Sequence, residues 1–326
     1  MNQTDGAKRL PLLLIAYSRD AGVKNLLNSI NPLDISEIYL TLDGAKSVDV
    51  ALTQEEIVRT VSSYCLANSI PFHTWLREDN LGVAVSIISS IDWFFKHVNS
   101  GVIAEDDLLL GNSFFDFMRM GLDFIDKNPD VLLVSGDCFL EESSSNFKAY
   151  LTNYPLIWGW GTTSFNWIKI REGILSSRKC DTSFSLNKRL NFWKVGAARV
   201  HRGQIDTWDI PFVDFMLSQN KFCLFPSVNL VTNNGYDSYA THTFGEEFPL
   251  NLPVHEWNSS SRINLEPLYE LCEEVNSQLD RRVFKIRIRH SILGIIFIIR
   301  KFFGLESPKL QPLLNRIRMV SIPEPK

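Results

Sequence analysis

Several signals that would point directly to a function are absent from this sequence. The five cysteines lie more than forty residues apart and include no CxxC pair, which argues against a zinc ribbon or a disulfide framework and favours a reducing compartment. No GxGxxG follows the first apolar run and no GxxxxGK(S/T) occurs, so neither common glycine loop for phosphates is present. That first run, residues 10–18, is short, contains Pro11 and lacks an A-x-A cleavage site. We therefore interpret it as a β-strand and not as a signal peptide.

Charge is unevenly distributed along a chain whose composition is ordinary for a globular protein. Apolar residues make up 45% and charged residues 21% of its 326 residues, enough for one large domain or two small ones with a sizeable core. The net charge of −4 argues against a general nucleic-acid-binding protein. Residues 281–326 contain 11 Lys and Arg against two Glu, a charge of +9, which leaves −13 on the first 280 residues. This basic tail predicts contact with an anionic surface.

The first 140 residues alternate apolar runs with helical patterns, which is typical of βαβ units and a parallel sheet. We predict strands over residues 10–18, 37–44, 70–79, 101–107 and 130–139, separated by helices over residues 21–30, 53–68, 80–98 and 113–130. Beyond residue 140 the rhythm changes, and aromatic and glycine-rich segments follow. We therefore expect an α/β fold with a mostly parallel, doubly wound sheet, a second lobe over the same sheet, and a helical tail from residue 251 to residue 326.

The basic tail contains an apolar segment that is too short to span a bilayer. Its uncharged core, Ser291 to Ile299, has nine residues, whereas a transmembrane helix needs roughly 20. Lys and Arg flank this core on both sides, a composition typical of a helix lying at a membrane surface. A helix with basic ends that packs in the core or in an oligomer contact fits equally well, so both interpretations of residues 281–303 stay open.

Polar residues follow four of the predicted strands where each strand ends. In doubly wound sheets these carboxyl ends form the ligand-binding edge. The residues at this edge are Tyr17, Ser18, Arg19, Asp43, Asn80, Glu105, Asp106 and Asp107. Local explanations exist for some of them. Asp43 with the following glycine is an ordinary turn pair, Asn80 is a suitable N-cap for the next helix, and a loop arginine such as Arg19 commonly lies on the surface.

Glu105, Asp106 and Asp107 form the most informative motif, because three consecutive carboxylates repel one another unless something compensates them. Mg²⁺ and Mn²⁺ prefer oxygen ligands and often take one or two from the protein and the rest from phosphates and water. A sheet without a glycine loop can therefore bind a nucleotide diphosphate through a cation held by carboxylates. Acids at a strand end are commonly solvated or cap the next helix, so the motif alone leaves both interpretations open.

Several segments together resemble the GT-A glycosyltransferases, particularly bacterial members related to the N-acetylglucosaminyltransferase I group. In chain order they are "LTLDG", "REDNLGVAVSIISSIDWFF", "EDD", "WGWG", "TWDIPF" and "NLVTNNGYDSYATHT". Their order and spacing within residues 10–245 carry the resemblance. It implies a GT-A-like domain over residues 1–250, with a nucleotide-binding half in residues 10–140 and an acceptor-side half in residues 141–250.

Carried over to the matching positions, the resemblance implies a role for each site residue. Asp107 would bind Mn²⁺ or Mg²⁺, Asp106 and Glu105 would bind ribose and donor-sugar hydroxyls, and Asp43 would contact the nucleobase. Asp209 would be the general base that takes the proton of the acceptor hydroxyl. The other residues implied at the nucleotide-sugar site are Tyr17, Ser18, Arg19, Asn80, Trp160 and Gly161, with His242 as a second candidate metal ligand.

Alternatives stay open at some of these positions. Threonines follow "WGWG" where some glycosyltransferases carry acids, so Asp209 is the best base candidate, with Asp206 and Asp214 close enough to compete with it. A tryptophan such as Trp160 is more often a packing residue than a sugar platform. A lone histidine such as His242 more often has a structural role.

Together these features predict a metal-dependent, inverting hexosyl- or N-acetylhexosaminyltransferase. It would move a sugar from a nucleotide-diphosphate donor to a glycan or lipid-linked acceptor in surface polysaccharide biosynthesis. The expected location is cytoplasmic, with peripheral contact at the inner face of the cell membrane. Two other functions stay open. A sugar nucleotidyltransferase needs a glycine-rich basic loop after the first strand, where "AYSRDAGVKN" has one glycine. A non-catalytic nucleotide-sugar-binding or scaffolding protein needs no base.

Overall fold

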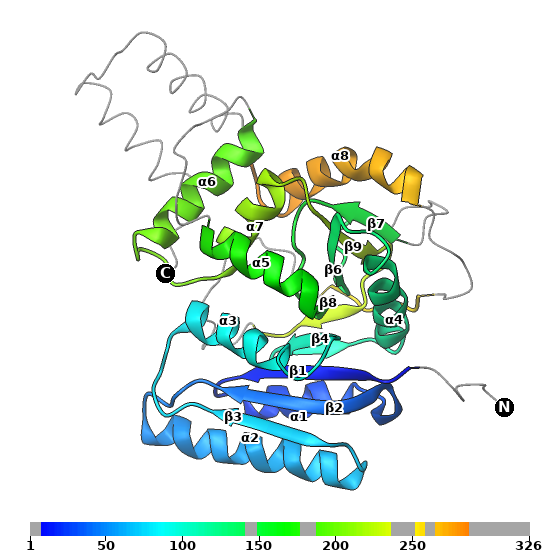
Figure 1. The fold of residues 1–326 in the computed structure, drawn as a ribbon. Helices are drawn as coiled ribbons and strands as arrows, with labels where there is room; N and C mark the ends of the chain where they lie inside the picture. Colours follow the sequence, from blue (N-terminus) through cyan, green and yellow to red (C-terminus); the bar gives the residue numbers. More distant parts are fainter. Residues whose placement is uncertain (1–7, 141–148, 177–186, 236–251, 258–264, 287–326) are drawn as a thin grey trace, which may run out of the picture.

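The computed structural model describes residues 8–140, 149–176, 187–235, 252–257 and 265–286, and an eight-stranded sheet lies at its centre (Figure 1). The strands are ordered β3-β2-β1-β4-β8-β6-β9-β7. Their bounds are β1 Leu10–Ala16, β2 Ile35–Leu42, β3 Phe72–Leu76, β4 Ser100–Glu105, β6 Val131–Ser135, β7 Ala149–Thr152, β8 Trp160–Thr163 and β9 Phe222–Pro226. A separate two-stranded sheet pairs β5, Leu108–Leu110, with β10, Val231–Asn233.

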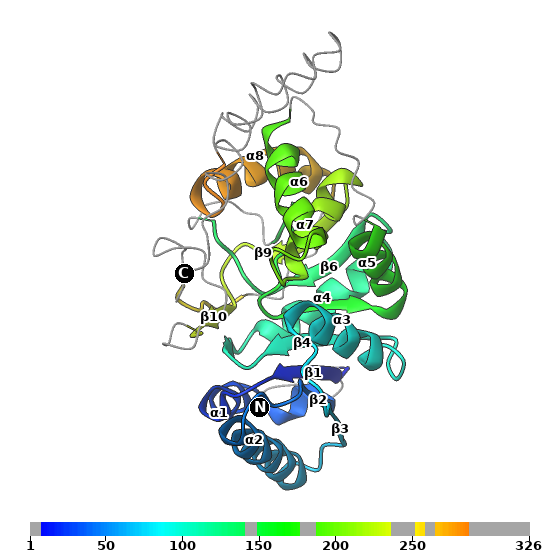
Figure 2. The same cartoon turned by 90° about the vertical axis from the view of Figure 1, so that its left-hand side faces the viewer.

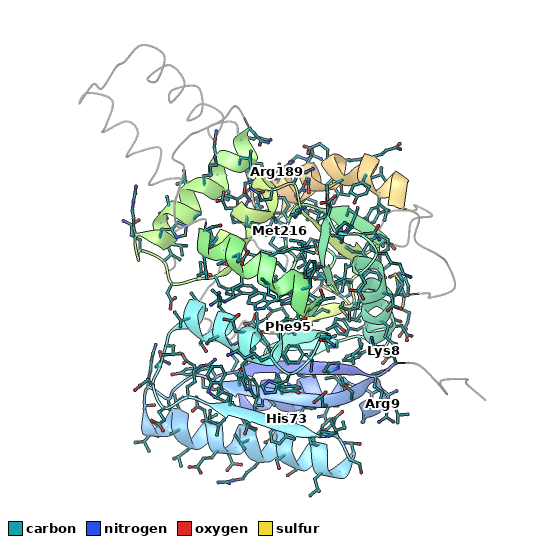
Figure 3. All side chains as sticks on the ribbon, in the orientation of Figure 1. Lys8, Arg9, His73, Phe95, Arg189 and Met216 are labelled. Carbon is teal, nitrogen blue, oxygen red and sulfur yellow. The ribbon has the colours of Figure 1, made fainter. Side chains whose placement is uncertain are left out.

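Helices cover both faces of the central sheet, as Figures 1 and 2 show. One core contains residues of α1 (Asp20–Asn28), α2 (Val48–Ala67) and α4 (Phe114–Ile125). The other contains residues of α3 (Val83–Phe94), α5 (Ser164–Ser176), α6 (Lys188–His201) and α7 (Asp209–Ser218). Helix α8 (Leu265–Arg282) contributes to both cores and lies beside β7, the last strand of the sheet. Figure 3 shows the side chains that fill the space between these layers.

The residues of β1 show why the sheet is covered on both sides. Leu12 and Leu14 belong to the core that contains α1 and α2, whereas Leu13 and Ile15 belong to the core that contains α3. All four side chains are buried. An uninterrupted apolar run of this kind is typical of a parallel strand with both faces covered. The predicted α/β fold with a mostly parallel, doubly wound sheet is therefore confirmed.

The second half of the chain joins the sheet itself, which the sequence pattern did not indicate. Strands β1, β2, β3, β4 and β6 coincide with the five strands predicted before residue 140. Strands β7, β8 and β9 follow residue 140, and β8 runs antiparallel between β4 and β6. Ile103 of β4 and Ser135 of β6 both pair with Trp160 of β8. Both predicted halves thus share one sheet, and the boundary near residue 250 stays a prediction.

Most of the predicted membrane-surface segment, from residue 287 onward, lies outside the described residues. Within the ranges that the structure does describe, no helix is long and apolar enough to cross a membrane. Membrane contact through residues 281–303 therefore stays a prediction.

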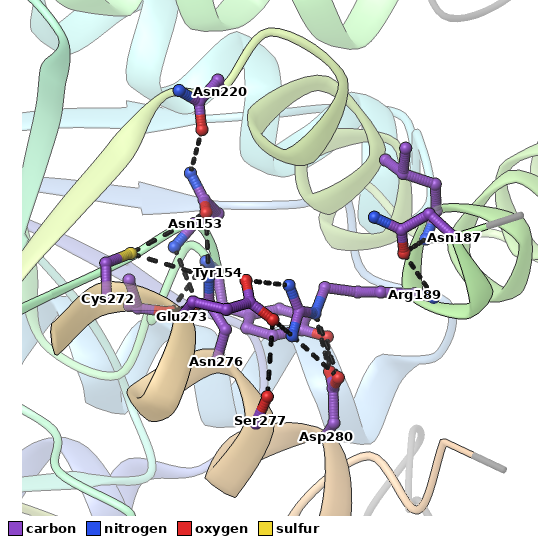
Figure 4. Close-up of polar contacts among 12 residues, drawn as sticks. Asn153, Tyr154, Asn187, Arg189, Asn220, Cys272, Glu273, Asn276, Ser277 and Asp280 are labelled. Atoms are coloured by element: carbon purple, nitrogen blue, oxygen red, sulfur yellow. Dashed lines mark hydrogen bonds and ion pairs between the residues drawn. The ribbon is translucent and has the colours of Figure 1, made fainter. Parts of the chain in front are cut away.

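A buried polar network fixes α8 to α6 and to the segment after β7 (Figure 4). Arg189 of α6 donates through Nε to both carboxylate oxygens of Asp280, at 3.0 and 3.1 Å. Its two terminal nitrogens bond the carboxylate of Glu273 at 2.9 and 3.0 Å. Tyr154, just after β7, donates its hydroxyl proton to Asp280. Because the Arg189 and Asp280 side chains are almost completely buried, each requires the other as a partner.

Loss of Arg189 should leave Asp280 as a buried and uncompensated charge. We expect Arg189→Ala to lower the free energy of unfolding by about 3–5 kcal/mol. Urea unfolding measures this change, with Arg59→Ala as the control. Arg59 forms exposed ion pairs with Glu55 and Glu56, so its loss should cost less than about 1 kcal/mol. Equal effects of the two substitutions would show that the network does not stabilise the fold.

Candidate functional site

The carboxyl ends of β1 and β4 lie side by side, and this brings two predicted groups of site residues into contact. Ile15 of β1 pairs with Glu105 of β4. Tyr17, the first residue after β1, donates its backbone N–H to Asp106 Oδ2 at 3.1 Å. Ser18 follows Tyr17 and is half-buried. The register between the two strands therefore holds residues 17–19 against the acidic motif, as the strand-end pattern predicted.

Arg19 supplies a positive charge to two of the three acids. Its Nη1 lies 3.1 Å from Asp107 Oδ2 and 3.4 Å from Asp106 Oδ1. The Arg19 and Asp107 side chains are 22% and 18% exposed, so both reach the protein surface. A Cβ atom at Gly22, in the first turn of α1, would lie 2.1 Å from the backbone oxygen of Asp106. The close approach of α1 to the acids therefore requires glycine at this position.

The acids raise one another's pKa. Burial, together with the negative charges of Asp107, Asp106 and Asp209, raises the pKa of Glu105 to about 8, while Arg19 opposes the shift. Burial and the charge of Asp107 raise the pKa of Asp106 to about 6, against the hydrogen bonds from Tyr17 and Arg19. The end of β4 is thus a concentration of negative charge that a cation would relieve.

The segment after β10 also contacts Asp107. The sequence pattern did not predict this contact in detail. Asn234 donates its backbone N–H to the carbonyl oxygen of Asp107 at 2.8 Å. A Cβ atom at Gly235 would lie 2.4 Å from Asp107 Oδ2, so a glycine is needed where this backbone meets the carboxylate. The Asn-Asn-Gly sequence in "NLVTNNGYDSYATHT" was the local signal of a turn at which the backbone can approach Asp107 closely.

The chemistry of Asp106 and Asp107 fits a divalent cation. Their carboxylate oxygens are the hard ligands that Mg²⁺ and Mn²⁺ prefer, they converge on a cationic group, and Asp107 is partly exposed. The described ranges contain no group of three or more His, Cys, Asp or Glu side chains that could hold a metal. The remaining ligands would therefore be phosphates and water, as is usual for Mg²⁺. His242, the second predicted ligand, lies outside the described residues.

Asp43 and Asn80 jointly hold the loop that leads into α3. The Asp43 carboxylate accepts hydrogen bonds from the Leu81 N–H at 3.0 and 3.1 Å and from the Gly82 N–H at 3.1 Å. Asn80 donates its side-chain amide to the carbonyl oxygen of Gly44 at 2.8 Å, and α3 begins three residues after Asn80. Asn80 is therefore not the N-cap of the helix. Contact of either residue with a nucleotide stays a prediction.

Three acids compete as the general base, and the structure gives each a different environment. Asp206 accepts two backbone hydrogen bonds at the start of α3. Asp214 is buried, one of its carboxylate oxygens has no hydrogen-bond partner among the described residues, and burial raises its pKa to about 6. Asp209 is the first residue of α7, is half-buried, and its charge is close enough to raise the pKa of Glu105. Asp209 thus combines accessibility with closeness to the acidic motif.

Trp160 and Gly161 lie inside the sheet and not in a loop beside the acids. Trp160 pairs with Ile103 of β4, and its ring packs against Trp208 and Phe212 at centroid distances of 6.0 and 6.3 Å. Because Trp160 is 1% exposed, its ring offers no surface to a sugar. Because β8 is inserted between β4 and β6, Trp160 packs in the core and does not form the expected sugar platform. We therefore leave Trp160 and Gly161 out of the proposed site.

Comparison with known proteins gives similarities at the level of solved structures. No protein-family model matches the sequence, and no curated protein matches it. Glucosyl-3-phosphoglycerate synthase from Mycobacterium tuberculosis, solved with Mn²⁺, UDP and phosphoglyceric acid, is 12% identical over 49% of this chain and 57% of its own, with a TM-score of 0.30. The glycosyltransferase GlyE of Streptococcus pneumoniae is 10% identical over 72% of this chain and 57% of its own, with a TM-score of 0.35.

A UDP-glucose pyrophosphorylase, solved with UDP-glucose, is 8% identical over 67% of this chain and 90% of its own, with a TM-score of 0.35. The similarity to both glycosyltransferases spans little more than half of their length, and TM-scores this low carry no conclusion about the reaction. The order and direction of the strands define the class instead. This is an α/β protein with a mostly parallel central sheet. The narrower resemblance to the N-acetylglucosaminyltransferase I group is not supported by these comparisons.

The raised pKa of Glu105 predicts a pH-dependent effect on stability. Its pKa rises from 4.5 to about 8 on folding, so the folded state binds this proton more tightly than the unfolded state. The resulting stabilisation is complete below pH 4.5 and is lost as the pH rises towards 8. We expect Glu105→Gln to be more stable than the wild type at pH 8, by up to about 4 kcal/mol, because glutamine carries no charge there.

Urea unfolding of both proteins between pH 4 and pH 8 tests this expectation, and the difference should disappear at the acidic end. Glu172→Gln is the matched control because Glu172 is an exposed residue of α5. If the two variants show the same pH dependence of stability, the pKa of Glu105 is not raised by folding.

Proposed function

We propose that this protein is a glycosyltransferase that uses a nucleotide-diphosphate sugar. The observation that carries the proposal is the meeting of Arg19 with Asp106 and Asp107 at the carboxyl ends of β1 and β4. It gathers both signs of charge at the edge where doubly wound sheets bind nucleotides. The narrower parts of the proposal are a hexosyl or N-acetylhexosaminyl donor, a glycan or lipid-linked acceptor, and kinship with the N-acetylglucosaminyltransferase I group.

The proposal gives the donor diphosphate a place beside Arg19 and Asp107. The planar guanidinium of Arg19 matches the oxygens of a phosphate group, and it reaches the surface together with Asp107. Asp107, with Asp106, would hold Mn²⁺ or Mg²⁺, and a bound cation supplies Lewis-acid stabilisation of the departing diphosphate. Glu105, the last residue of β4, would bind a ribose or donor-sugar hydroxyl.

Asp209 is the proposed general base. The acceptor hydroxyl oxygen forms a bond to the anomeric carbon, the bond from that carbon to the diphosphate oxygen breaks, and the hydroxyl proton passes to Asp209. Attack from the side opposite the departing diphosphate inverts the anomeric configuration. The Thr207 hydroxyl and the Ile210 N–H, the latter at 2.7 Å, both donate to Asp209 Oδ1, so hydrogen bonds orient the carboxylate.

The loop between β1 and α1 favours a glycosyltransferase over a sugar nucleotidyltransferase. Residues 17–19 are the three that separate β1 from α1, which is too few for a glycine-rich loop around a triphosphate. A non-catalytic nucleotide-sugar-binding protein would share the same site and differ in the absence of turnover. A role in surface polysaccharide biosynthesis and a cytoplasmic, membrane-peripheral location complete the proposal.

A donor titration tests the nucleotide site. We expect one of the UDP-, GDP-, dTDP- and CMP-sugars to stabilise the protein against heat in the presence of Mn²⁺, by about 2.7 kcal/mol at 100 times its Kd. The effect should be lost with EDTA and in Asp107→Ala. Asp123→Ala, an exposed position on α4, is the matched control and should respond like the wild type. No response to any donor in the wild type would contradict the proposal.

Substitution of the base tests the reaction. With the donor identified, Asp209→Asn should lower kcat by about 10²–10⁴-fold, because general-base assistance is lost, while the thermal stabilisation by the donor stays unchanged. NMR of the product should show inversion at the anomeric carbon, and retention would overturn the role of Asp209. Stabilisation by a donor without any transfer or hydrolysis in the wild type would instead identify a binding protein.

A further inference from the structure

The start of α3 is held by two acids that are distant in sequence. Four consecutive backbone N–H groups, from Leu81 to Ala84, donate to carboxylates. The first two bond Asp43, as described above. The Val83 N–H donates to Asp206 Oδ2 at 2.9 Å, and the Ala84 N–H donates to Asp206 Oδ1 at 3.2 Å. The N-cap residue Gly82 has no capping side chain, so these acids take over that role.

The backbone conformation at Gly82 allows the Asp206 carboxylate to approach the start of α3 closely. Gly82 has a φ of +78°, a conformation that side-chain-bearing residues rarely adopt. A Cβ atom at Gly82 would lie 2.6 Å from Asp206 Oδ2, so only glycine lets the carboxylate approach this closely. The negative charge of Asp206 also lies at the positive end of the α3 dipole. The contact between Asp206 and α3 is therefore specific in its geometry and its charge.

Asp206 belongs to the same short segment as the proposed base. Thr207 and Trp208, the two residues between Asp206 and Asp209, are buried. The Trp208 ring stacks on Trp160 at a centroid distance of 6.0 Å, which fixes the segment to the core. The hydroxyl of Thr207 donates to Asp209. Asp206 thus connects this segment to α3 in the first half of the chain.

We propose that Asp206 is a positioning residue, which holds residues 206–210 against α3 so that the Asp209 carboxylate keeps its place at the start of α7. This inference rests on the proposed function of Asp209 as the base. Because Asp43 bonds the first two of the four amides and Asp206 the last two, the loop before α3 joins the proposed nucleobase contact to the segment that carries the base. A purely structural cap would stabilise α3 without fixing Asp209, and the two roles make different predictions.

Hydrogen exchange on the full-length protein separates these roles without a substrate. In Asp206→Ala we expect amide exchange to become about tenfold faster at residues 83 and 84, and faster also across residues 206–210. Asp206→Asn keeps one acceptor oxygen and should show a smaller change. Asp49→Ala removes an exposed acid from the first turn of α2 and is the matched control. Faster exchange confined to α3, or no change at all, would overturn the proposal.

Kinetics provide the second measurement. Asp206→Ala should lower kcat by about 10–100-fold, since small displacements of a catalytic group have effects of this size, with the KM for the donor unchanged. Asp206→Asn should restore part of the loss, and Asp49→Ala should behave as the wild type. An unchanged kcat in Asp206→Ala would overturn the proposal. If the wild type turns over no donor, the proposed function fails, and the exchange at residues 206–210 still decides whether Asp206 holds that segment.

Discussion

The site depends on how negative charge is accommodated at the end of a buried strand. Asp106 and Asp107 follow directly after β4, and removing a carboxylate such as that of the buried Asp106 from water is costly unless hydrogen bonds and positive charge compensate it. The compensation comes from the neighbouring strand, through the Tyr17 N–H and the Arg19 guanidinium. Because β1 and β4 pair in parallel, both strands end at the same edge. The sheet order itself therefore creates the charged site.

Two acidic side chains at the start of α3 link the two halves of the chain. Helix α3 follows the loop that Asp43 and Asn80 hold, and its first N–H groups need acceptors because they have no partner within the helix. Asp43 and Asp206 satisfy them. Strand β8 links the halves again through the sheet. The second half is thus joined to the first by hydrogen bonds and packing at several places.

The parts of the fold that were predictable have local signals. Strands such as β1 and β4 contain uninterrupted apolar runs because both of their faces are buried, and turn or helix signals follow them. Strand β8 has four residues, two of them threonines, and its partners β4 and β6 lie far from it in sequence. Nothing local distinguishes Trp160 in this strand from a tryptophan in an exposed loop. Its burial follows from the antiparallel insertion, which periodicity does not describe.

The acids of the second half likewise differ in ways that local sequence signals do not predict. Asp206, Asp209 and Asp214 lie within nine residues and are equivalent by composition, yet one caps a helix, one lies near the acidic motif and one is buried. By itself, the sequence determined the α/β alternation and the placing of acids at strand ends, because both depend on short-range periodicity. Only the tertiary structure decided which partner each acid meets. Those partners lie 87 residues apart for Arg19 and Asp106, and 123 residues apart for Val83 and Asp206, where strand register and packing bring them together.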